Sequence, residues 1–161
     1  MCKLRTNDGI LLTMATLVEH PRAKFDYELL ETYEAGLELH GHEVKALRKH
    51  AGSLLGSHVI VRGGEAFLVG ATIPPYQAGN TPKEYESGRA RRLLLSKKEI
   101  RELADKEGTK GLTIVPLSVY NKGKVLKLSL AVARGKKTFD KREVIKKRET
   151  DIAIRRTLKN Q

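Results

Sequence analysis

The stretch GLTIVPLSVYNKGKVLKLSLAVA, residues 111–133, decides the fold. Two runs rich in β-branched and aliphatic residues flank the polar segment Asn121-Lys122-Gly123, a pattern typical of two antiparallel strands joined by a tight turn. Pro116 cannot donate a hydrogen bond to a neighbouring strand, so it predicts an edge or a bulge within the first run. In the second run the large apolar side chains share one face of the strand: Leu126, Leu128, Leu130 and Val132. The stretch therefore predicts a hairpin with one buried face.

Two further segments upstream carry strand patterns. Residues 57–71, SHVIVRGGEAFLVGA, predict another hairpin, because Gly63-Gly64 can adopt the positive φ angles of a tight turn. Residues 27–39 alternate between an apolar face on the odd positions and a polar face that carries Glu34. Gly36 inside this strand suggests a bulge or a bend.

Two helices complete the predicted fold. Residues 41–52, GHEVKALRKHAG, indicate a short helix between glycines. Residues 95–108 indicate a longer one, because Ser96 and Glu99 form a capping box and Gly108 ends the pattern. About six strands and two short-to-medium helices predict a mainly β protein, with an antiparallel sheet that closes into a small β-barrel.

The charge of the chain is large and uneven. The 161 residues carry a formal net charge of +12, so a polyanion is the expected partner. Residues 134–161 contain eleven Lys and Arg against four Asp and Glu, which gives +7 for this segment alone. We therefore divide the chain into an N-terminal extension (1–19), a folded body (20–133) and a basic tail (134–161).

The tail has good helix propensity from Asp140 to Lys159 but few apolar residues. Its apolar positions do not form a stripe wide enough to bury on the body, and an isolated helix of this length is marginal in water. We predict a tail that is disordered when free and helical on a polyanion. The charge alone also fits a tail that only aids solubility.

Composition argues against several other classes of protein. The single cysteine, Cys2, cannot form an internal disulfide and suggests a reducing compartment, so we expect a cytoplasmic protein. The apolar run at 10–18 is too short to span a bilayer, and no signal-peptide cleavage site follows it. His40 and His42 are the closest histidine pair, but no further metal ligand stands at a recognisable spacing. Because nucleotide-binding loops and hydrolase motifs are also lacking, we expect no metal, no cofactor and no catalytic residue.

Several segments together resemble the SsrA-binding protein family, also called small protein B. They occur in the family's order and spacing over roughly residues 20–159: FDYELLETYEAGLELHGHEVKALR, ATIPPY, RARRLLLSKKEI, GLTIVPLSVY and LAVARGKKTFDKREVIKKRE. Each segment alone is a weak signal, but the ordered set is specific.

The resemblance implies a monomeric, non-enzymatic protein with an oligonucleotide-binding (OB-like) β-barrel. In this family the barrel binds the tRNA-like part of transfer-messenger RNA (tmRNA, or SsrA). The protein delivers that RNA to stalled ribosomes for trans-translation, which tags the incomplete peptide for degradation and rescues the ribosome. The tail enters the empty messenger channel near the decoding centre, contacts ribosomal RNA and becomes helical there.

The resemblance also implies functional residues. Glu34 matches the family's RNA-contacting glutamate, and its place on the polar strand face agrees with the alternation. The residues expected to bind RNA are His20, Arg22, Lys24, Glu34, Lys45, Arg48, Arg89, Arg91, Arg92, Leu93 and Leu94. Those expected to bind the ribosome through the tail are Lys136, Lys137, Phe139, Asp140, Lys141, Arg142, Lys146, Lys147 and Arg148.

The sequence departs from the family at a few positions. His20 stands where an RNA-contacting asparagine is usual, Phe25 replaces a histidine, and ESGR at 86–89 replaces the usual DPxR. Two alternative functions stay open at this point. One is a generic RNA-binding barrel, such as a ribosomal or assembly protein, and the other is a small nucleic-acid-processing enzyme.

Overall fold

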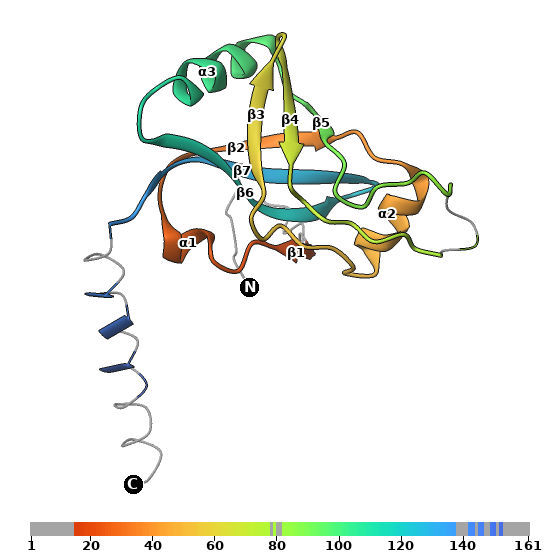
Figure 1. Cartoon of the computed structure of the whole chain (residues 1–161), viewed down its shortest axis with the longest axis horizontal. Helices are drawn as coiled ribbons and strands as arrows, with labels where there is room; N and C mark the ends of the chain where they lie inside the picture. The colour runs from red at the N-terminus through yellow and green to blue at the C-terminus, as the bar shows by residue number, and fades with distance from the viewer. Residues whose placement is uncertain are drawn as a thin grey trace, which may run out of the picture.

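The computed structural model describes residues 15–77, 79 and 82–137, and in the tail residues 142, 143, 145, 146, 149, 150 and 152. Up to residue 137 the described chain forms a seven-stranded antiparallel sheet and three helices, and the described tail residues are helical (Figure 1). The helices are α1 (Ala23–Asp26), α2 (Gly41–Arg48) and α3 (Lys97–Glu107). The strands are β1 (Thr16–Glu19), β2 (Tyr27–Leu37), β3 (His58–Arg62), β4 (Glu65–Val69), β5 (Arg91–Leu94), β6 (Leu112–Lys122) and β7 (Val125–Gly135).

The sheet closes on itself. Its strand order is β1-β6-β3-β4-β5-β2-β7, and β7 also pairs with β6, which joins the two sides into a ring. The long strands β2, β6 and β7 form most of the ladder, whereas β3 meets β6 through the single pair Val59↔Ile114. The predicted antiparallel, mainly β fold is confirmed. Strand β1, within the segment that we assigned to an N-terminal extension, pairs with β6 and adds to this sheet.

Both predicted hairpins are present. Gly63 and Gly64 have φ angles of 60° and 76° and connect the paired residues Arg62 and Glu65. Two consecutive positive φ angles define the tight turn that matches the twist of a hairpin, and glycine adopts them without steric cost. In the β6–β7 hairpin the turn falls at 123–124, one position later than predicted. The register of β6 shifts directly after Pro116, so the predicted bulge is confirmed.

Strand β2 follows the predicted alternation, but its bulge does not lie at the predicted residue. Its register against β7 shifts between Leu29 and Glu31, so the bulge lies at Leu30 and our placement of it at Gly36 is wrong. Gly36 instead serves a close approach between strands. It pairs with Leu94 of β5, and a Cβ at Gly36 would lie 3.1 Å from the Leu94 Cβ. The missing side chain lets β5 join β2 at this point.

The two predicted helices are confirmed, and the structure adds a short helix, α1, that was not predicted. Ser96 caps α3, since its side chain accepts a hydrogen bond from the Glu99 backbone and the Glu99 carboxylate bonds back to Ser96. Leu103 of α3 is fully buried in the core, whereas the neighbouring Ala104 is exposed. At the end of α3 the Glu107 carboxylate accepts a 2.8 Å hydrogen bond from the Val61 backbone and thereby ties the helix to β3.

The main apolar core lies inside the ring. Val115, Ala131 and Ala133, which alternate with core residues on β6 and β7, are buried as well, so this part of the outer face is covered. The most completely buried aliphatic residues come from α2, α3 and five strands: Leu47, Val59, Leu68, Leu93, Leu103, Ile114, Leu128, Leu130 and Val132. The long strands have two ends, with α1 and the start of the tail at one and α2 at the other (Figure 1). Within the described residues, no helix combines the length and the apolar character needed to cross a membrane.

Candidate nucleic-acid interface

The strand register places several predicted residues on one outer face of the ring. Gly36 of β2 pairs with Leu94 of β5 on one side and with Lys127 of β7 on the other. Paired residues of antiparallel strands point to the same face, and so do residues two positions apart on one strand. Glu34, Leu94 and Lys127 therefore share a face, which we call the Glu34 face.

Glu34 is held by three neighbouring donors. The Tyr120 hydroxyl donates to Glu34 Oε2, and the Lys122 ammonium lies 2.9 and 3.2 Å from the two carboxylate oxygens. The Lys127 ammonium follows at 3.7 Å. With 37% of its side chain still accessible, Glu34 is a fixed acceptor at the surface of a basic patch. It is neither buried nor freely solvated. A partner that binds here would therefore contact a carboxylate whose position is fixed by its neighbours.

The same contacts determine the ionisation states of Glu34 and Tyr120. The Tyr120 hydrogen bond lowers the pKa of the Glu34 carboxyl, with smaller contributions from Lys122 and Lys127 that outweigh a modest effect of burial. Burial raises the pKa of the Tyr120 phenol, and the hydrogen bond to Glu34 raises it further. At neutral pH, Glu34 is thus an anion and Tyr120 a protonated donor, which is the pairing that a stable acceptor requires.

Leu94 supplies an apolar element beside this acceptor. Its side chain is 54% exposed, an unusual state for a leucine in a strand that joins a closed sheet. The neighbouring Leu93 is only 2% exposed and packs in the core. Of the two leucines predicted to bind RNA, Leu94 is accessible, and the prediction for Leu93 is corrected because its side chain faces the interior.

Basic residues extend the Glu34 face toward α2. Lys45 and Arg48 lie on the exposed side of that helix, as a contact role requires. The Arg48 guanidinium donates a 3.1 Å hydrogen bond to the carbonyl of Lys124 in the β6–β7 turn. This bond joins α2 to the hairpin and brings the positive charge of Arg48 close to the β6–β7 turn.

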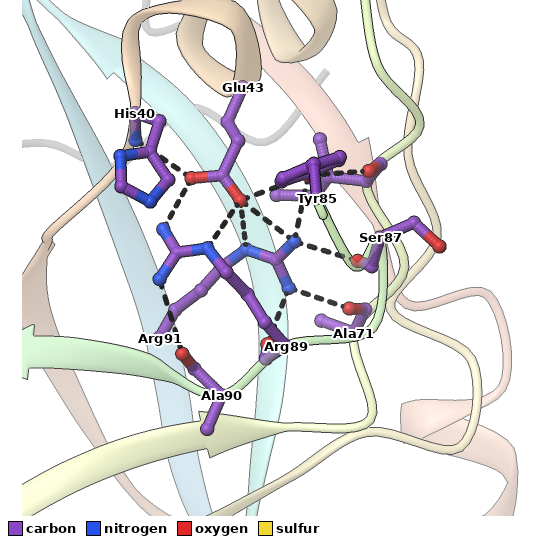
Figure 2. A network of polar contacts seen from close by, with 9 residues as sticks. His40, Glu43, Ala71, Tyr85, Ser87, Arg89, Ala90 and Arg91 are labelled. Atoms are coloured by element: carbon purple, nitrogen blue, oxygen red, sulfur yellow. Dashed lines mark hydrogen bonds and ion pairs between the residues drawn. The ribbon is translucent and has the colours of Figure 1, made fainter. Parts of the chain in front are cut away.

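Arg89 and Arg91, predicted to contact phosphate, belong instead to an internal network (Figure 2). The Arg91 side chain is fully buried, and its Nε donates a 3.0 Å hydrogen bond to Glu43 Oε1. Its other nitrogens donate to the carbonyls of Ala71 and Ser87, each at 2.7 Å. Arg91 therefore cannot reach an external phosphate, and its predicted role is corrected.

Arg89 donates to both oxygens of the same carboxylate. Its Nε lies 3.0 Å from Glu43 Oε1 and its Nη2 lies 2.6 Å from Oε2, and 27% of its side chain is accessible. Arg92 points outward and pairs with Glu65 at 2.9 Å and with Glu38 at 3.7 Å. Of the three arginines, Arg92 is the one that both faces solvent and carries only surface ion pairs, which a polyanion can displace.

The remaining predicted RNA contacts lie at the other end of β2. Arg22 and Lys24 are exposed on α1, and Arg22 pairs with Asp26 at 3.3 Å. His20 is only 8% exposed, and its backbone donates a 2.8 Å hydrogen bond to Leu117. The structure thus separates the predicted residues into two groups, one on the Glu34 face and one around α1.

The tail begins at a fixed point. Lys136 donates two hydrogen bonds to α1, one from its backbone to the Asp26 carbonyl at 2.9 Å and one from its ammonium to the Lys24 carbonyl at 2.8 Å. Arg142 and Lys146 are helical and exposed, and the described tail residues lie apart from the sheet (Figure 1). The other tail residues predicted to bind the ribosome lie outside the described residues, except Lys137: Phe139, Asp140, Lys141, Lys147 and Arg148.

Metal-binding side chains do not gather among the described residues: no group of three His, Cys, Asp or Glu there could hold an ion. His40 and His42 stack on each other with ring centres 5.5 Å apart, and His42 packs edge-on against Tyr85 at 4.4 Å. The pair therefore packs against the loop that follows β4.

Three residues of the Glu34 face were not predicted: Tyr120, Lys122 and Lys127. Lys127 stands between inward-facing Leu126 and Leu128, so the alternation alone places it on the outer face. Its proximity to Glu34 depends on the register between β2 and β7, which joins residues about ninety positions apart and has no local signal.

Known proteins are similar to this chain in sequence and in fold. A family model described as SmpB protein matches residues 17–160. The SsrA-binding protein of Thermosipho africanus is 46% identical over 147 residues, 91% of this chain and 98% of that protein. The SsrA-binding protein of Gloeothece citriformis is 42% identical over 143 residues, 89% and 92% of the two chains. A chain solved under the description "tmRNA-SmpB: a journey to the center of the bacterial ribosome" superposes with a TM-score of 0.64 and 44% identity, over 77% of this chain and 87% of that one.

Proposed function

This chain belongs to the SmpB protein family, and from that premise we propose that it binds tmRNA and acts with it on stalled ribosomes in trans-translation. The observation that carries the proposal is the family match over residues 17–160, which includes both the ring and the basic tail. We infer a binding protein rather than an enzyme, acting in the cytoplasm where ribosomes are.

The Glu34 face is the proposed site for the folded part of the RNA. Its lysines and Arg48 attract phosphates and position the RNA, whereas Glu34 accepts hydrogen bonds from the amino groups of exposed bases. Leu94 offers an apolar surface to an unstacked base or ribose. A carboxylate repels phosphates, so its presence amid the lysines favours an RNA that presents a donor at this point over one that offers only charge.

The tail is the proposed site for the ribosome. Its charge suits ribosomal RNA, and Lys136 fixes the direction in which it leaves the body. Ile145 and Ile152 are 42% and 49% exposed, so these side chains are available to pack against a partner. That the tail, residues 134–161, is disordered when free and becomes helical on the ribosome stays a prediction, although Arg142, Lys146 and Ile152 are already helical in the free chain.

A competition titration across salt tests the proposed function. Full-length protein is titrated with tmRNA and with bulk tRNA at several salt concentrations. We expect at least about a tenfold preference for tmRNA, with both affinities falling as salt rises because phosphate neutralisation releases counterions. Equal affinity for the two RNAs would refute a tmRNA-specific site and favour a generic RNA-binding protein.

Replacing Glu34 with glutamine separates specific from electrostatic binding. Removal of a negative charge beside Lys122 and Lys127 raises the positive potential, which by itself strengthens RNA binding. Loss of a charge-assisted acceptor has the opposite sign and costs about 1.5–3 kcal/mol. We expect the affinity for tmRNA to fall by about tenfold or more while the affinity for random RNA is unchanged or slightly higher.

Glu28→Gln is the matched control for this measurement. Glu28 is exposed and lies on the same strand, six residues from Glu34. Its replacement by glutamine removes the same charge, but away from Lys122 and Lys127. Its tmRNA affinity should stay within about twofold of wild type. If Glu34→Gln binds tmRNA as tightly as Glu28→Gln does, the carboxylate makes no specific contact.

A further inference from the structure

The Tyr120 side chain reaches Glu34 across an intervening strand. Tyr120 of β6 pairs with Lys127 of β7, so it shares the Glu34 face. Glu34 of β2 lies on the other side of β7, opposite Ser129. Neighbouring strands are about 4.8 Å apart, so β6 and β2 are separated by about 10 Å. A long side chain is needed to close that distance, and the Tyr120 hydroxyl closes it by donating to Glu34 Oε2.

The Tyr120 phenol is held in one position. The residue is only 8% exposed although it lies on the outer face of the ring. Its backbone is paired on both sides, with Thr16 of β1 and with Lys127 of β7. Strand β1 is tied in turn to the end of α2, because His50 Nδ1 donates a 2.8 Å hydrogen bond to the Leu17 carbonyl. A ring packed on a backbone that is fixed in this way presents its hydroxyl in a set direction.

The contacts within the protein leave one acceptor position of Glu34 unused. A carboxylate offers about four such positions, two on each oxygen. Tyr120 uses one on Oε2, and the Lys122 ammonium bonds to Oε1 at 2.9 Å and to Oε2 at 3.2 Å. The Lys127 ammonium, 3.7 Å from Oε1, lies beyond hydrogen-bond distance. Counted over the described residues, Oε1 therefore keeps one position for a donor from outside the protein.

We propose that Tyr120 is a positioning residue for RNA recognition: its hydroxyl fixes Oε2 of Glu34 and thereby presents Oε1 to one donor group of an exposed base. Because Tyr120 is almost completely buried, it acts through Glu34 and not by touching the RNA. The two lysines cannot replace it, since an ammonium on a flexible stem can turn toward a phosphate of the bound RNA, whereas a neutral phenol is not drawn away. The proposal rests on the proposed function for RNA as the partner of Glu34.

A double-mutant cycle tests whether Tyr120 acts through Glu34. Tyr120→Phe removes only the hydroxyl, and Glu34→Ala removes the group that the hydroxyl positions. We expect Tyr120→Phe to weaken tmRNA binding by about fivefold in the wild-type chain and by less than about twofold in the Glu34→Ala background. Equal losses in the two backgrounds would overturn the proposal, because Tyr120 would then act on the RNA or on the fold directly. Unchanged affinity in the wild-type chain would overturn it as well.

Tyr33→Phe is the matched control for lost stability. The Tyr33 hydroxyl also donates to a carboxylate, that of Glu31 at 2.9 Å, but Tyr33 adjoins Glu34 on β2 and so points to the opposite face. Both tyrosine variants should unfold at a lower urea concentration than wild type, whereas Tyr33→Phe should bind tmRNA within about twofold of wild type. If Tyr33→Phe weakens binding as much as Tyr120→Phe does, the loss reflects stability and the positioning role is wrong.

A pH series adds a readout that a purely structural role would not change. The charged groups that the described structure places against Glu34 are Lys122 of β6 and Lys127 of β7, whereas β5 contributes the uncharged Leu94. The Tyr120 hydrogen bond is the largest of the effects that lower the pKa of Glu34, so its removal raises that pKa. On acidification, the tmRNA affinity of Tyr120→Phe should therefore begin to fall at a higher pH than that of wild type. Coincident pH profiles would contradict the proposal.

These outcomes also separate the positioning role from the proposed function. Failure of the wild-type protein to bind tmRNA would refute the proposed function. Normal tmRNA binding by Glu34→Ala would refute the contact through Glu34, and the role of Tyr120 with it. A weakened Glu34→Ala beside an unaffected Tyr120→Phe would overturn the positioning role alone and leave the proposed function standing.

Discussion

Replacing Glu43 with glutamine is expected to lower the free energy of unfolding by about 3 kcal/mol, the largest effect on stability that we predict for one polar residue. The Glu43 side chain is fully buried and is the common acceptor for Arg89, Arg91 and the backbone of His40 (Figure 2). Glutamine has nearly the same shape but carries an NH₂ group in place of one oxygen. That group would face guanidinium donors, and the positive charge of Arg91 would stay buried without compensation.

The loss spreads beyond one ion pair because the network joins three parts of the chain. Glu43 belongs to α2, Arg91 to β5, and Tyr85 and Ser87 to the loop between β4 and β5. The Tyr85 hydroxyl lies 3.0 Å from Glu43 Oε1 and 2.8 Å from the carbonyl of Ile73. Chemical denaturation of the full chain measures the effect, with Glu84→Gln on the exposed part of the same loop as the control. A loss below about 1 kcal/mol would show that Glu43 is not the centre of the network.

The same carboxylate makes stability depend on pH. Burial alone raises the pKa of Glu43, but the hydrogen bonds from Arg89 and His40 and the charge of Arg91 outweigh it and lower the pKa from 4.5 to about 2. Because the folded pKa lies below the unfolded one, this stabilisation is complete above pH 4.5. It declines as pH falls and is lost once pH passes below 2. The interval corresponds to about 3 kcal/mol.

Glutamine resembles the protonated acid, which gives the pH dependence its own test. The difference in unfolding free energy between wild type and Glu43→Gln should be constant above pH 5 and should shrink steadily toward pH 2. Other carboxylates titrate over the same range in both proteins, so they cancel in the difference. A difference that does not change with pH would mean that Glu43 has the same pKa in the folded and unfolded chains, which would contradict the lowered folded pKa.

The elements that sequence predicts best are those whose signals are local. Gly63-Gly64, the Ser96–Glu99 capping box and the alternation around Glu34 each lie within a few residues, and each is confirmed. Arg91 was misassigned because RARRLLLSKK resembles an exposed basic segment, while its partner Glu43 lies 48 residues away. The alternation held a usable signal. Arg91 and Leu93 are two positions apart, so burial of the leucine predicts burial of the arginine.

In the candidate site, too, the local features could be predicted from sequence and the long-range contacts could not. Alternation indicated that Glu34 points outward, and it could have placed Lys127 outward as well. The contact between them depends on a register in which Glu34 lies opposite Ser129 and Gly36 opposite Lys127. That register results from closure of the whole ring rather than from any segment. A pocket beside His20, lined by residues between 20 and 27, by 55–58 and by Thr113, depends likewise on three separated parts of the chain.

Truncation after Lys137 is expected to abolish peptide tagging on stalled ribosomes, by at least about a hundredfold, while tmRNA affinity changes by no more than about threefold. The cut preserves the body, because Gly135 still pairs with Tyr27 and Lys136 still bonds to α1. A cut after Arg134 would remove those contacts and confuse loss of the tail with damage to the ring. In vitro translation of a message without a stop codon, with tagged and untagged products separated, measures the effect.

A full-length variant with residues 138–161 in scrambled order is the control for charge. It keeps every basic residue but changes the spacing of the isoleucines and the i,i+4 pairs that favour a helix. If tagging needs only positive charge, the scrambled tail restores it, and the tail is a nonspecific anchor. If the folded helix carries the function, the scrambled tail binds ribosomes but does not support tagging. Full tagging by the truncated protein would contradict any ribosomal role for the tail and would leave tmRNA delivery to the ring alone.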